Sequence, residues 1–379
     1  MKIPLSAPDI TEPEIEAVAA VLRTPQLSLG PKLAEFEACL ATYCGTPHAI
    51  AVSSGTAGLH LCLRALNLRP EHEVIVPSFT FIAAANVIRY VGATPVFVDI
   101  EPNSLNLSPA SIQQAITPRT RAIIMVHTFG TPADIKAIQQ IAHRHQLLLI
   151  EDACEAIGAE YDGQKIGSFG DAAVFAFYPN KQITTGEGGM VVTRHPELAA
   201  SVRALRNQGR GPTDDWLQHT ELGYNYRISE INCALGIAQM NRIEEILARR
   251  AVVAHHYHQL LSGTGGLILP SIALPNIRIS WFVFVVRLSA DYSVHHRDAI
   301  VQRLQAAGIG CGRYFAPIHL QPSYSHWRTS SQLPVTEAQA QRTIALPFFN
   351  RITEAQIAQV CSALVSALQS MEPLSQTAS

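Results

Sequence analysis

The chain has 379 residues, of which 47% are hydrophobic and 15% are charged. This length and composition predict two folded domains, or one large domain with an appendage, around a substantial apolar core. The 28 Lys and Arg residues nearly balance the 30 Asp and Glu residues, and the sequence has no basic run or acidic tail. We therefore expect no nucleic acid and no membrane among its partners.

Cysteine usage and the N-terminal segment indicate the compartment. The seven cysteines are odd in number, lie mostly in apolar stretches and include no C-x-x-C pair. This spacing disfavours a disulfide framework and a thiolate metal site. The N-terminus lacks the apolar core of a signal peptide, and no stretch approaches the ~20 apolar residues of a membrane span. We expect a cytoplasmic protein without a bound metal, and the high apolar content favours an oligomer.

Two helices are predicted first. A capping box from Thr11 to Glu14 indicates a helix running to about Arg23, and a second helix is expected over 31–43. From about residue 48 to 193, β-rich runs alternate with helical patterns, which is typical of an α/β fold with a mainly parallel sheet between helices. The expected strands, apolar enough to be buried on both faces, are 48–53, 73–77, 95–99, 122–127, 147–152, 173–177 and 189–193.

The pattern changes after Tyr226. Residues 228–261 predict one long helix, followed by a lone strand at 281–288, a helix near 296–307 and a final helix over 353–369. The sequence thus predicts a large domain over 1–245 and a smaller α+β domain over 246–379.

A turn rich in small residues follows the first predicted strand. After Val52 the chain enters a helix through Ser54, Gly55 and Thr56, which leaves free backbone N–H groups at a helix N-terminus. Such a turn can bind an anion, although an ordinary capped turn has the same residues. No G-x-G-x-x-G follows the strand, which weighs against a dinucleotide site.

Two further residues, Asp152 and Lys181, are candidates for a site near this turn. Asp152 ends an apolar strand at the carboxyl edge of the sheet, where it could hold a cationic ring nitrogen or simply cap a turn. Lys181 lies between an apolar strand and a Gly-rich turn, where a desolvated amine could form a Schiff base, although a solvated loop lysine is commoner. An anion cradle, a pyridinium partner and such a lysine are what pyridoxal phosphate requires.

From about Ile3 to Val360 the chain resembles the DegT/StrS family of sugar aminotransferases, which are fold-type-I pyridoxal-phosphate enzymes. The motifs that carry the resemblance are SSGTAGLHL, PSFTFIAAANVI, PVFVDI, HTFGTPADI, EDACEAIGAEYDGQKIGSFGDAAVFAFYPNKQITTGEGGM, GYNYRISEINCALG and YFAPIHLQPSY. The resemblance implies that Lys181 forms the Schiff base with pyridoxal 5'-phosphate, that Asp152 pairs with the pyridine nitrogen, and that Gly55 and Thr56 bind the phosphate.

Further roles follow from the same resemblance. Phe81 would stack on the ring, although core packing explains an aromatic there equally well. Glu155 would touch the ring hydroxyl, and Asn225 would reach the phosphate bound by the partner subunit of a homodimer with shared sites. One departure is Ala176, where many relatives carry a serine that binds the phosphate.

Three residues are weaker candidates for substrate binding. Tyr314 and His319 occupy positions at which relatives contact the sugar nucleotide, although a structural role fits them equally well. Arg227 could bind the carboxylate of the amino donor or brace a dimer. We expect the remaining histidines, such as His127 at a strand end, to lie in the core or on the solvated surface rather than at a metal site.

The implied reaction moves an amino group from an amino acid, with glutamate expected, to a nucleotide-linked keto-sugar, through pyridoxamine 5'-phosphate. One alternative is a dehydratase or epimerase on the same cofactor. The dehydratases of the family have His in place of the Schiff-base lysine, so the retained Lys181 disfavours dehydration. Another alternative is a non-enzymatic regulator, which would not need Lys181 and Asp152 together.

Overall fold

The structure, a computed structural model, describes residues 2–211, 218–327 and 332–373. Its centre is a seven-stranded sheet in the order β1-β9-β8-β5-β4-β2-β3. Neighbours from β8 to β3 are parallel, whereas β9 is antiparallel to both β1 and β8. The predicted α/β fold is therefore confirmed. Its strands are β1 (His48–Val52), β2 (Glu73–Pro77), β3 (Thr94–Val98), β4 (Thr120–Val126), β5 (Leu148–Asp152), β8 (Ala172–Ala176) and β9 (Gly189–Thr193).

Both faces of this sheet are covered by helices, because successive side chains of a strand point to opposite faces. On β4, Ile123 and Met125 pack into one apolar cluster, whereas Ile124 and Val126 pack into another. The helices that contribute to the first cluster are α2 (Pro31–Cys44), α5 (Pro109–Ala115), α6 (Ile135–Arg144), α8 (Glu230–Met240) and the start of α9 (Ile243–Leu261). Those of the second are α3 (Gly55–Ala65), α4 (Ala83–Tyr90) and α7 (Pro196–Arg206).

The two predicted N-terminal helices are confirmed as α1 (Glu12–Leu22) and α2. The capping box also forms, since the Glu14 carboxylate accepts a hydrogen bond from the Thr11 N–H at 2.8 Å. Glu14 is fully buried, because it also contacts residues more than 200 positions away in the sequence.

The prediction of one long helix over 228–261 is wrong. Two helices, α8 and α9 (Ile243–Leu261), are separated at Asn241 and Arg242. The Arg242 side chain is held there by the Glu14 carboxylate and the Asp9 carbonyl, both at 2.7 Å. The apolar periodicity continues through the break, so the local pattern did not reveal it.

The expectation of a lone strand at 281–288 is also wrong. The strand β12 (Phe284–Leu288) starts later and lies in the middle of a three-stranded antiparallel sheet, between β10 (Leu267–Ile268) and β13 (Thr343–Leu346). Its partners are too short to show a periodic pattern of their own. The two predicted C-terminal helices are confirmed as α10 (Val294–Ala306) and α12 (Glu354–Gln369), and they pack with α9 around this sheet.

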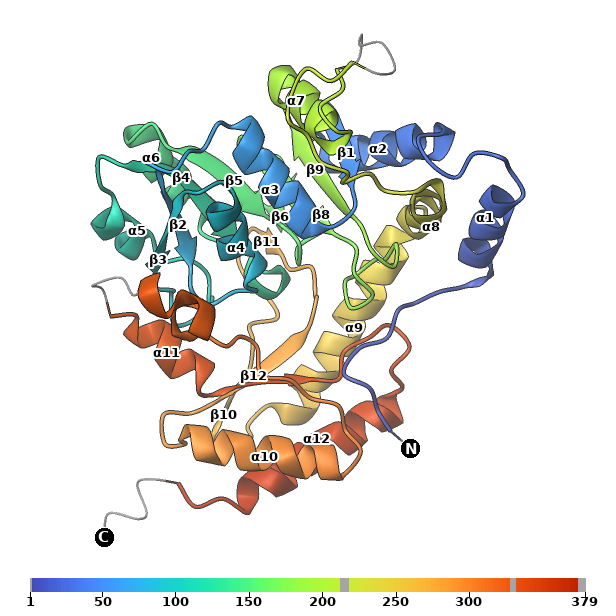
Figure 1. Cartoon of the computed structure of the whole chain (residues 1–379). Coiled ribbons are helices and arrows are strands. Elements are labelled where there is room, and N and C mark those ends of the chain that lie inside the picture. The colour runs from blue at the N-terminus through green and yellow to red at the C-terminus, as the bar shows by residue number, and fades with distance from the viewer. Residues whose placement is uncertain (1, 212–217, 328–331, 374–379) are drawn as a thin grey trace.

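Figure 1 shows this smaller lobe below the central sheet, with α9 running between the two. The N-terminal segment joins the smaller lobe, because Ile3 pairs with Ile309. Conversely, β11 (Ile277–Arg278) pairs with β6 (Glu160–Tyr161), which also pairs with β7 (Gln164–Lys165). The helix α11 (Pro334–Ala340) follows on the side of β3 in Figure 1. The division at residue 245 therefore stays a prediction, and it falls within the first turn of α9.

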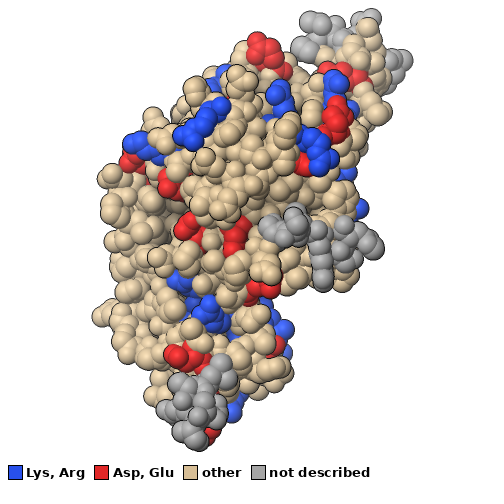
Figure 2. Space-filling view, turned by 90° about the vertical axis from the view of Figure 1, so that its left-hand side faces the viewer, with Lys and Arg blue, Asp and Glu red and all other residues tan. Residues whose placement is uncertain are grey.

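The surface carries mixed charge. On the face shown in Figure 2, Lys and Arg are interspersed with Asp and Glu, and uncharged residues cover most of the area. Within residues 2–211, 218–327 and 332–373, no helix is long and apolar enough to span a membrane. The same part of the chain holds no cluster of three or more His, Cys, Asp or Glu side chains that could bind a metal.

Candidate active site

The turn between β1 and α3 is packed directly on the sheet. Ser54 caps α3 by accepting a hydrogen bond from the Ala57 N–H at 3.1 Å. A Cβ atom on Gly55 would lie 2.8 Å from both the Ala176 Cβ and the Cys154 Sγ, so only glycine fits. The first N–H groups of α3, those of Gly55 and Thr56, have no acceptor within the helix. These two N–H groups form a cradle suited to a phosphate.

Asp152 lies at the carboxyl end of β5, on the same edge of the sheet as this cradle. Its side chain is buried, and Oδ1 accepts a hydrogen bond from the Cys154 N–H at 3.2 Å. Burial and the nearby Asp152 charge raise the pKa of Cys154 well above its ordinary value, so this thiol stays protonated. Asp152 is thus a shielded carboxylate with capacity for a further hydrogen bond.

Lys181 follows β8 in a loop that the smaller lobe helps to hold. Its side chain is 14% exposed, and Nζ lies 4.2 Å from the centre of the Phe282 ring. Its ionic partner, Glu155 Oε1, is 3.6 Å away, which is too long for a hydrogen bond. Gln182 fixes the loop by donating to the Glu155 carbonyl at 2.6 Å and to Ser280 Oγ at 2.9 Å. The amine is therefore shielded from water but only loosely paired.

Glu155 connects Lys181 to the turn that follows β4. Its Oε2 accepts a hydrogen bond from the Phe129 N–H at 2.9 Å. Burial raises the pKa of Glu155, although the Lys181 charge acts in the opposite direction. The nearby Asp152 charge raises this pKa further, so three ionisable groups interact in one place.

Behind this edge lies a buried pair between His127 and Glu151. His127 Nδ1 accepts from the Ala133 N–H at 3.1 Å, so Nε2 carries the proton that it donates to Glu151 at 3.2 Å. Burial would raise the pKa of Glu151, but His127 and backbone N–H groups including that of Gly170 outweigh it and lower the pKa. His127 therefore occupies the core and braces the ends of β4 and β5.

Sequence reasoning missed the residues that position the Lys181 loop. Besides Gln182, these are Gln239, whose Oε1 accepts from the Thr184 N–H at 3.2 Å, and Asn232, which donates to the carbonyls of Thr185 and Glu187. The loop residues that Gln239 and Asn232 contact are more than 40 positions away in the sequence. No local signal could have identified them.

Three of the predicted residues lie toward the surface of the chain. Phe81, just before α4, is 62% exposed, and Asn225 is exposed as well. Arg227 donates from Nη1 to Asn207 Oδ1 at 2.9 Å and to Gln208 Oε1 at 2.7 Å. Both acceptors are neutral, so the Arg227 guanidinium could still pair with an anion.

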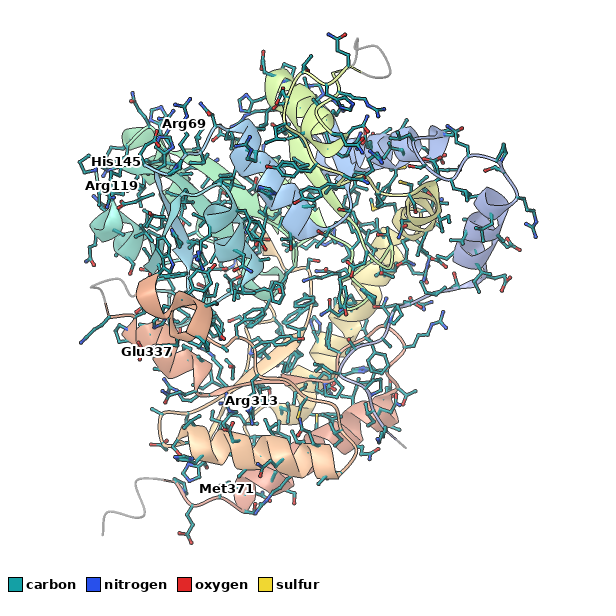
Figure 3. All side chains as sticks on the ribbon, viewed as in Figure 1. Arg69, Arg119, His145, Arg313, Glu337 and Met371 are labelled. Carbon is teal, nitrogen blue, oxygen red and sulfur yellow. The ribbon has the colours of Figure 1, made fainter. Side chains whose placement is uncertain are left out.

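The two predicted residues of the 314–319 segment differ in their surroundings. Tyr314 stacks on Phe315 at 5.2 Å, and burial together with the Glu155 charge raises its pKa. His319 uses both ring nitrogens: Nδ1 accepts from Ser78 Oγ at 2.6 Å, and Nε2 donates to Glu337, labelled on α11 in Figure 3, at 3.2 Å. Tyr314 therefore lies close enough to Glu155 to be affected by its charge, whereas His319 connects Ser78 with Glu337 on α11.

The residues present suit pyridoxal phosphate. The cradle at Gly55 can take the phosphate, Asp152 has a spare acceptor for a protonated ring nitrogen, and Nζ of Lys181 is not engaged in a hydrogen bond. In addition, Oδ1 of Asn180, next to Lys181, is buried without a hydrogen-bond partner among the described residues. A buried group of this kind indicates a missing ligand or water.

A sequence model of the DegT/DnrJ/EryC1/StrS aminotransferase family matches residues 8–365. The chain belongs to this family. It is 43% identical to the GDP-perosamine synthase of Caulobacter vibrioides over 365 residues, which cover 96% of this chain and 97% of that protein.

Solved structures agree with this assignment. A Streptococcus pneumoniae protein described as a sugar aminotransferase, solved in PLP and PMP forms, superposes with a TM-score of 0.93 at 28% identity, covering 97% of this chain and 98–99% of that chain. DesV of S. venezuelae, solved with a ketimine intermediate, has a TM-score of 0.90 at 36% identity, covering 98% of this chain and all of that one. The protein is therefore a pyridoxal-phosphate-dependent aminotransferase, related to enzymes that aminate sugars.

Proposed function

We propose that the enzyme transfers an amino group from glutamate to the ketone of a GDP-linked sugar. The observation that carries the proposal is the 43% identity to a GDP-perosamine synthase over nearly the whole of both chains. The seven cysteines are all free, which suits the reducing cytoplasm as the compartment.

Lys181 would act twice in this reaction. It would first hold the cofactor through a covalent bond from Nζ, and the incoming amino donor would then release it. The freed amine, shielded and loosely paired with Glu155, is suited to move a proton to and from the carbon that bears the amino group. When bound, pyridoxal phosphate supplies an electron sink for that carbon and stores the amino group between the half-reactions.

Other residues would orient the cofactor. Asp152 would hold a proton on the ring nitrogen, because a buried carboxylate stabilises a nearby cation. The N–H groups of Gly55 and Thr56 would bind the phosphate, and Phe81 would stack on the ring. Glu155 would contact the ring hydroxyl while pairing with Lys181.

We propose further that the active unit is a homodimer with shared sites, in which Asn225 reaches the phosphate bound by the other subunit. Asn225 and Phe81 are both exposed on the single chain, which supports an assembly that covers them. Lys181→Ala and Asn225→Ala should each be impaired alone. A mixed dimer would contain one intact site, so co-expression should restore activity above either parent. No recovery despite demonstrated heterodimers would refute the shared site.

Substrate choice can be tested directly. The purified enzyme would be incubated with glutamate and a panel of 3-keto and 4-keto sugars linked to GDP, UDP or dTDP. Conversion of the ketone to an amine is followed by mass spectrometry, and 2-oxoglutarate is measured in parallel. We expect amination of a GDP-linked sugar with one 2-oxoglutarate per amine. Loss of water without 2-oxoglutarate would instead support the dehydratase alternative, and preference for another nucleotide would overturn the GDP assignment.

A further inference from the structure

A cavity of about 140 Å³ lies between the two lobes of the molecule. Its walls come from four segments: residues 103–105 after β3, residues 128–131 after β4, residues 270–274 and residues 281–287. Neither Lys181 nor Asp152 lines it. The volume is close to that of a cavity of roughly 150 Å³ known to hold benzene in another protein, so a ring or a branched chain would fit.

Apolar side chains provide most of the lining, and polar residues provide the rest. The apolar side chains include Leu105, Phe129, Trp281, Val283 and Val285. The polar groups that share the cavity with them include Arg287, Thr128 and Thr131. A ligand that fills this space would therefore have an apolar body and a polar or charged end.

Arg287 is a buried cation, and no anionic side chain among the described residues pairs with it. It lies on β12, is 9% exposed, and donates from Nη1 to the Pro102 carbonyl and to Gln339 Oε1. Both acceptors are neutral, and within the described residues Nε and Nη2 have no acceptor. Burial and the nearby Arg342 charge lower the pKa of Arg287. A desolvated guanidinium with unused donors is costly unless an anion or water satisfies it.

We infer that this cavity is a second binding site of the enzyme, for a small monocarboxylate with an apolar body. The guanidinium of Arg287 has unused N–H donors and can pair with a carboxylate. The aromatic and aliphatic walls would contact the body of the ligand. A dicarboxylate such as glutamate would place its second charge against these apolar walls, which is unfavourable. The site therefore differs in chemistry from that of the proposed amino donor.

The test uses the holoenzyme and two fluorinated probes of equal size, 4-fluorobenzoate and the neutral 4-fluorobenzyl alcohol. Binding is followed by ¹⁹F NMR titration. We expect the carboxylate to bind, and both the alcohol and the Arg287→Met variant to show affinities weaker by about tenfold or more, because a charge-assisted hydrogen bond is lost.

The matched control is Arg313→Met, since Arg313 lies on the surface of the same lobe (Figure 3) and pairs with Asp298 at 3.2 Å. This variant should bind the carboxylate like the wild type. Equal affinity for acid and alcohol, unchanged affinity in Arg287→Met, or an equal loss in Arg313→Met would each overturn the inference. If Arg287→Met does not fold, Val285→Phe decides instead. It fills the cavity, so loss of binding supports the site and retained binding refutes it.

Discussion

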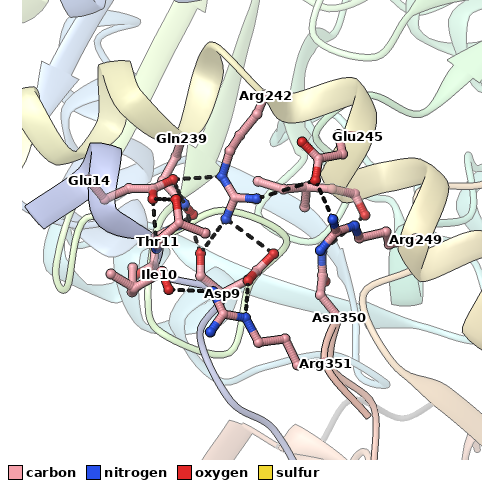
Figure 4. Close-up of polar contacts among 12 residues, drawn as sticks. Asp9, Ile10, Thr11, Glu14, Gln239, Arg242, Glu245, Arg249, Asn350 and Arg351 are labelled. Carbon is pink, nitrogen blue, oxygen red and sulfur yellow. Dashed lines mark hydrogen bonds and ion pairs between the residues drawn. The ribbon is translucent and has the colours of Figure 1, made fainter. Parts of the chain in front are cut away.

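Two clusters of charged side chains around buried carboxylates are built in opposite ways in this molecule. The N-terminal cluster consists of Asp9, Glu14, Gln239, Arg242 and Arg351, shown in Figure 4. Its ion pairs are short: 2.7 Å from Arg242 to Glu14, 3.1 Å from Arg242 to Asp9 and 2.7 Å from Arg351 to Asp9. In the Lys181 cluster, formed by Asp152, Glu155 and Lys181, the one ion pair is 3.6 Å long.

The pKa values follow the same division. Burial alone would raise the pKa of Glu14, but hydrogen bonds from Thr11, Arg242 and Gln239 outweigh it and lower the pKa to about 2. For Glu155, burial prevails and the pKa rises. Closely paired charges connect distant segments of the chain, whereas loosely paired ones leave donors and acceptors for a cofactor. The following predictions test this contrast, starting with the largest effect.

Lys181→Ala should lower kcat by ~10³-fold or more, because both the covalent link and the proton transfer are lost. Its thermal stability should stay near that of the wild type, since Lys181 Nζ makes only the long pair with Glu155. Steady-state kinetics and thermal unfolding measure the two effects. Lys136→Ala, at an exposed site on α6, is the control and should retain full activity. A Lys181→Ala enzyme with near wild-type turnover would show that the assignment is wrong.

Arg242→Met should show the reverse pattern. It leaves Asp9 and Glu14 buried without their shared partner, and we expect a loss of about 3–5 kcal/mol in the free energy of unfolding. The enzyme that remains folded should keep most of its kcat. Arg249→Met is the matched control, because its pair with Glu245 is about half exposed and should contribute only about 0–1 kcal/mol. Equal destabilisation of the two variants in urea unfolding would contradict the proposed difference between the clusters.

Asp152→Asn should bind the cofactor but lower the rate of the half-reaction with glutamate by about 10²-fold, since an amide cannot hold the ring nitrogen protonated. Cofactor absorbance measures binding, and rapid mixing with glutamate measures the rate. The exposed Asp291→Asn is the control. Unchanged half-reaction rates in Asp152→Asn would show that Asp152 only caps its turn.

Glu14→Gln should change the pH dependence of stability. The folded pKa of Glu14, about 2, lies below the unfolded value of ~4.3. Its contribution is therefore complete above the unfolded pKa and is lost as the pH falls toward 2. Unfolding free energies of the wild type should decline over this interval more steeply than those of Glu14→Gln. Parallel curves for the two proteins would show that Glu14 does not contribute in this way.

Local signals in the sequence were enough for much of the fold and for the central candidates. Capping residues such as Thr11 and Glu14, and continuous apolar runs such as β4 and β5, are encoded in adjacent residues. Asp152 and Lys181 could be singled out because each directly follows or ends such a run. Their roles remain predictions, whereas the family and the fold are established.

Only the tertiary structure decided the contacts between distant segments. The break at Arg242 depends on Asp9 and Glu14, more than 220 positions away, and apolar periodicity does not register it. The pairing of β12 with two short strands likewise became visible only when the smaller sheet was assembled. The cavity at Arg287 could not be predicted from the sequence either, because its walls come from four separate segments. The lack of an anionic partner for Arg287 among the described residues also leaves no pattern in the sequence. Periodicity and capping report on neighbours along the chain, whereas burial and charge pairing depend on neighbours in space.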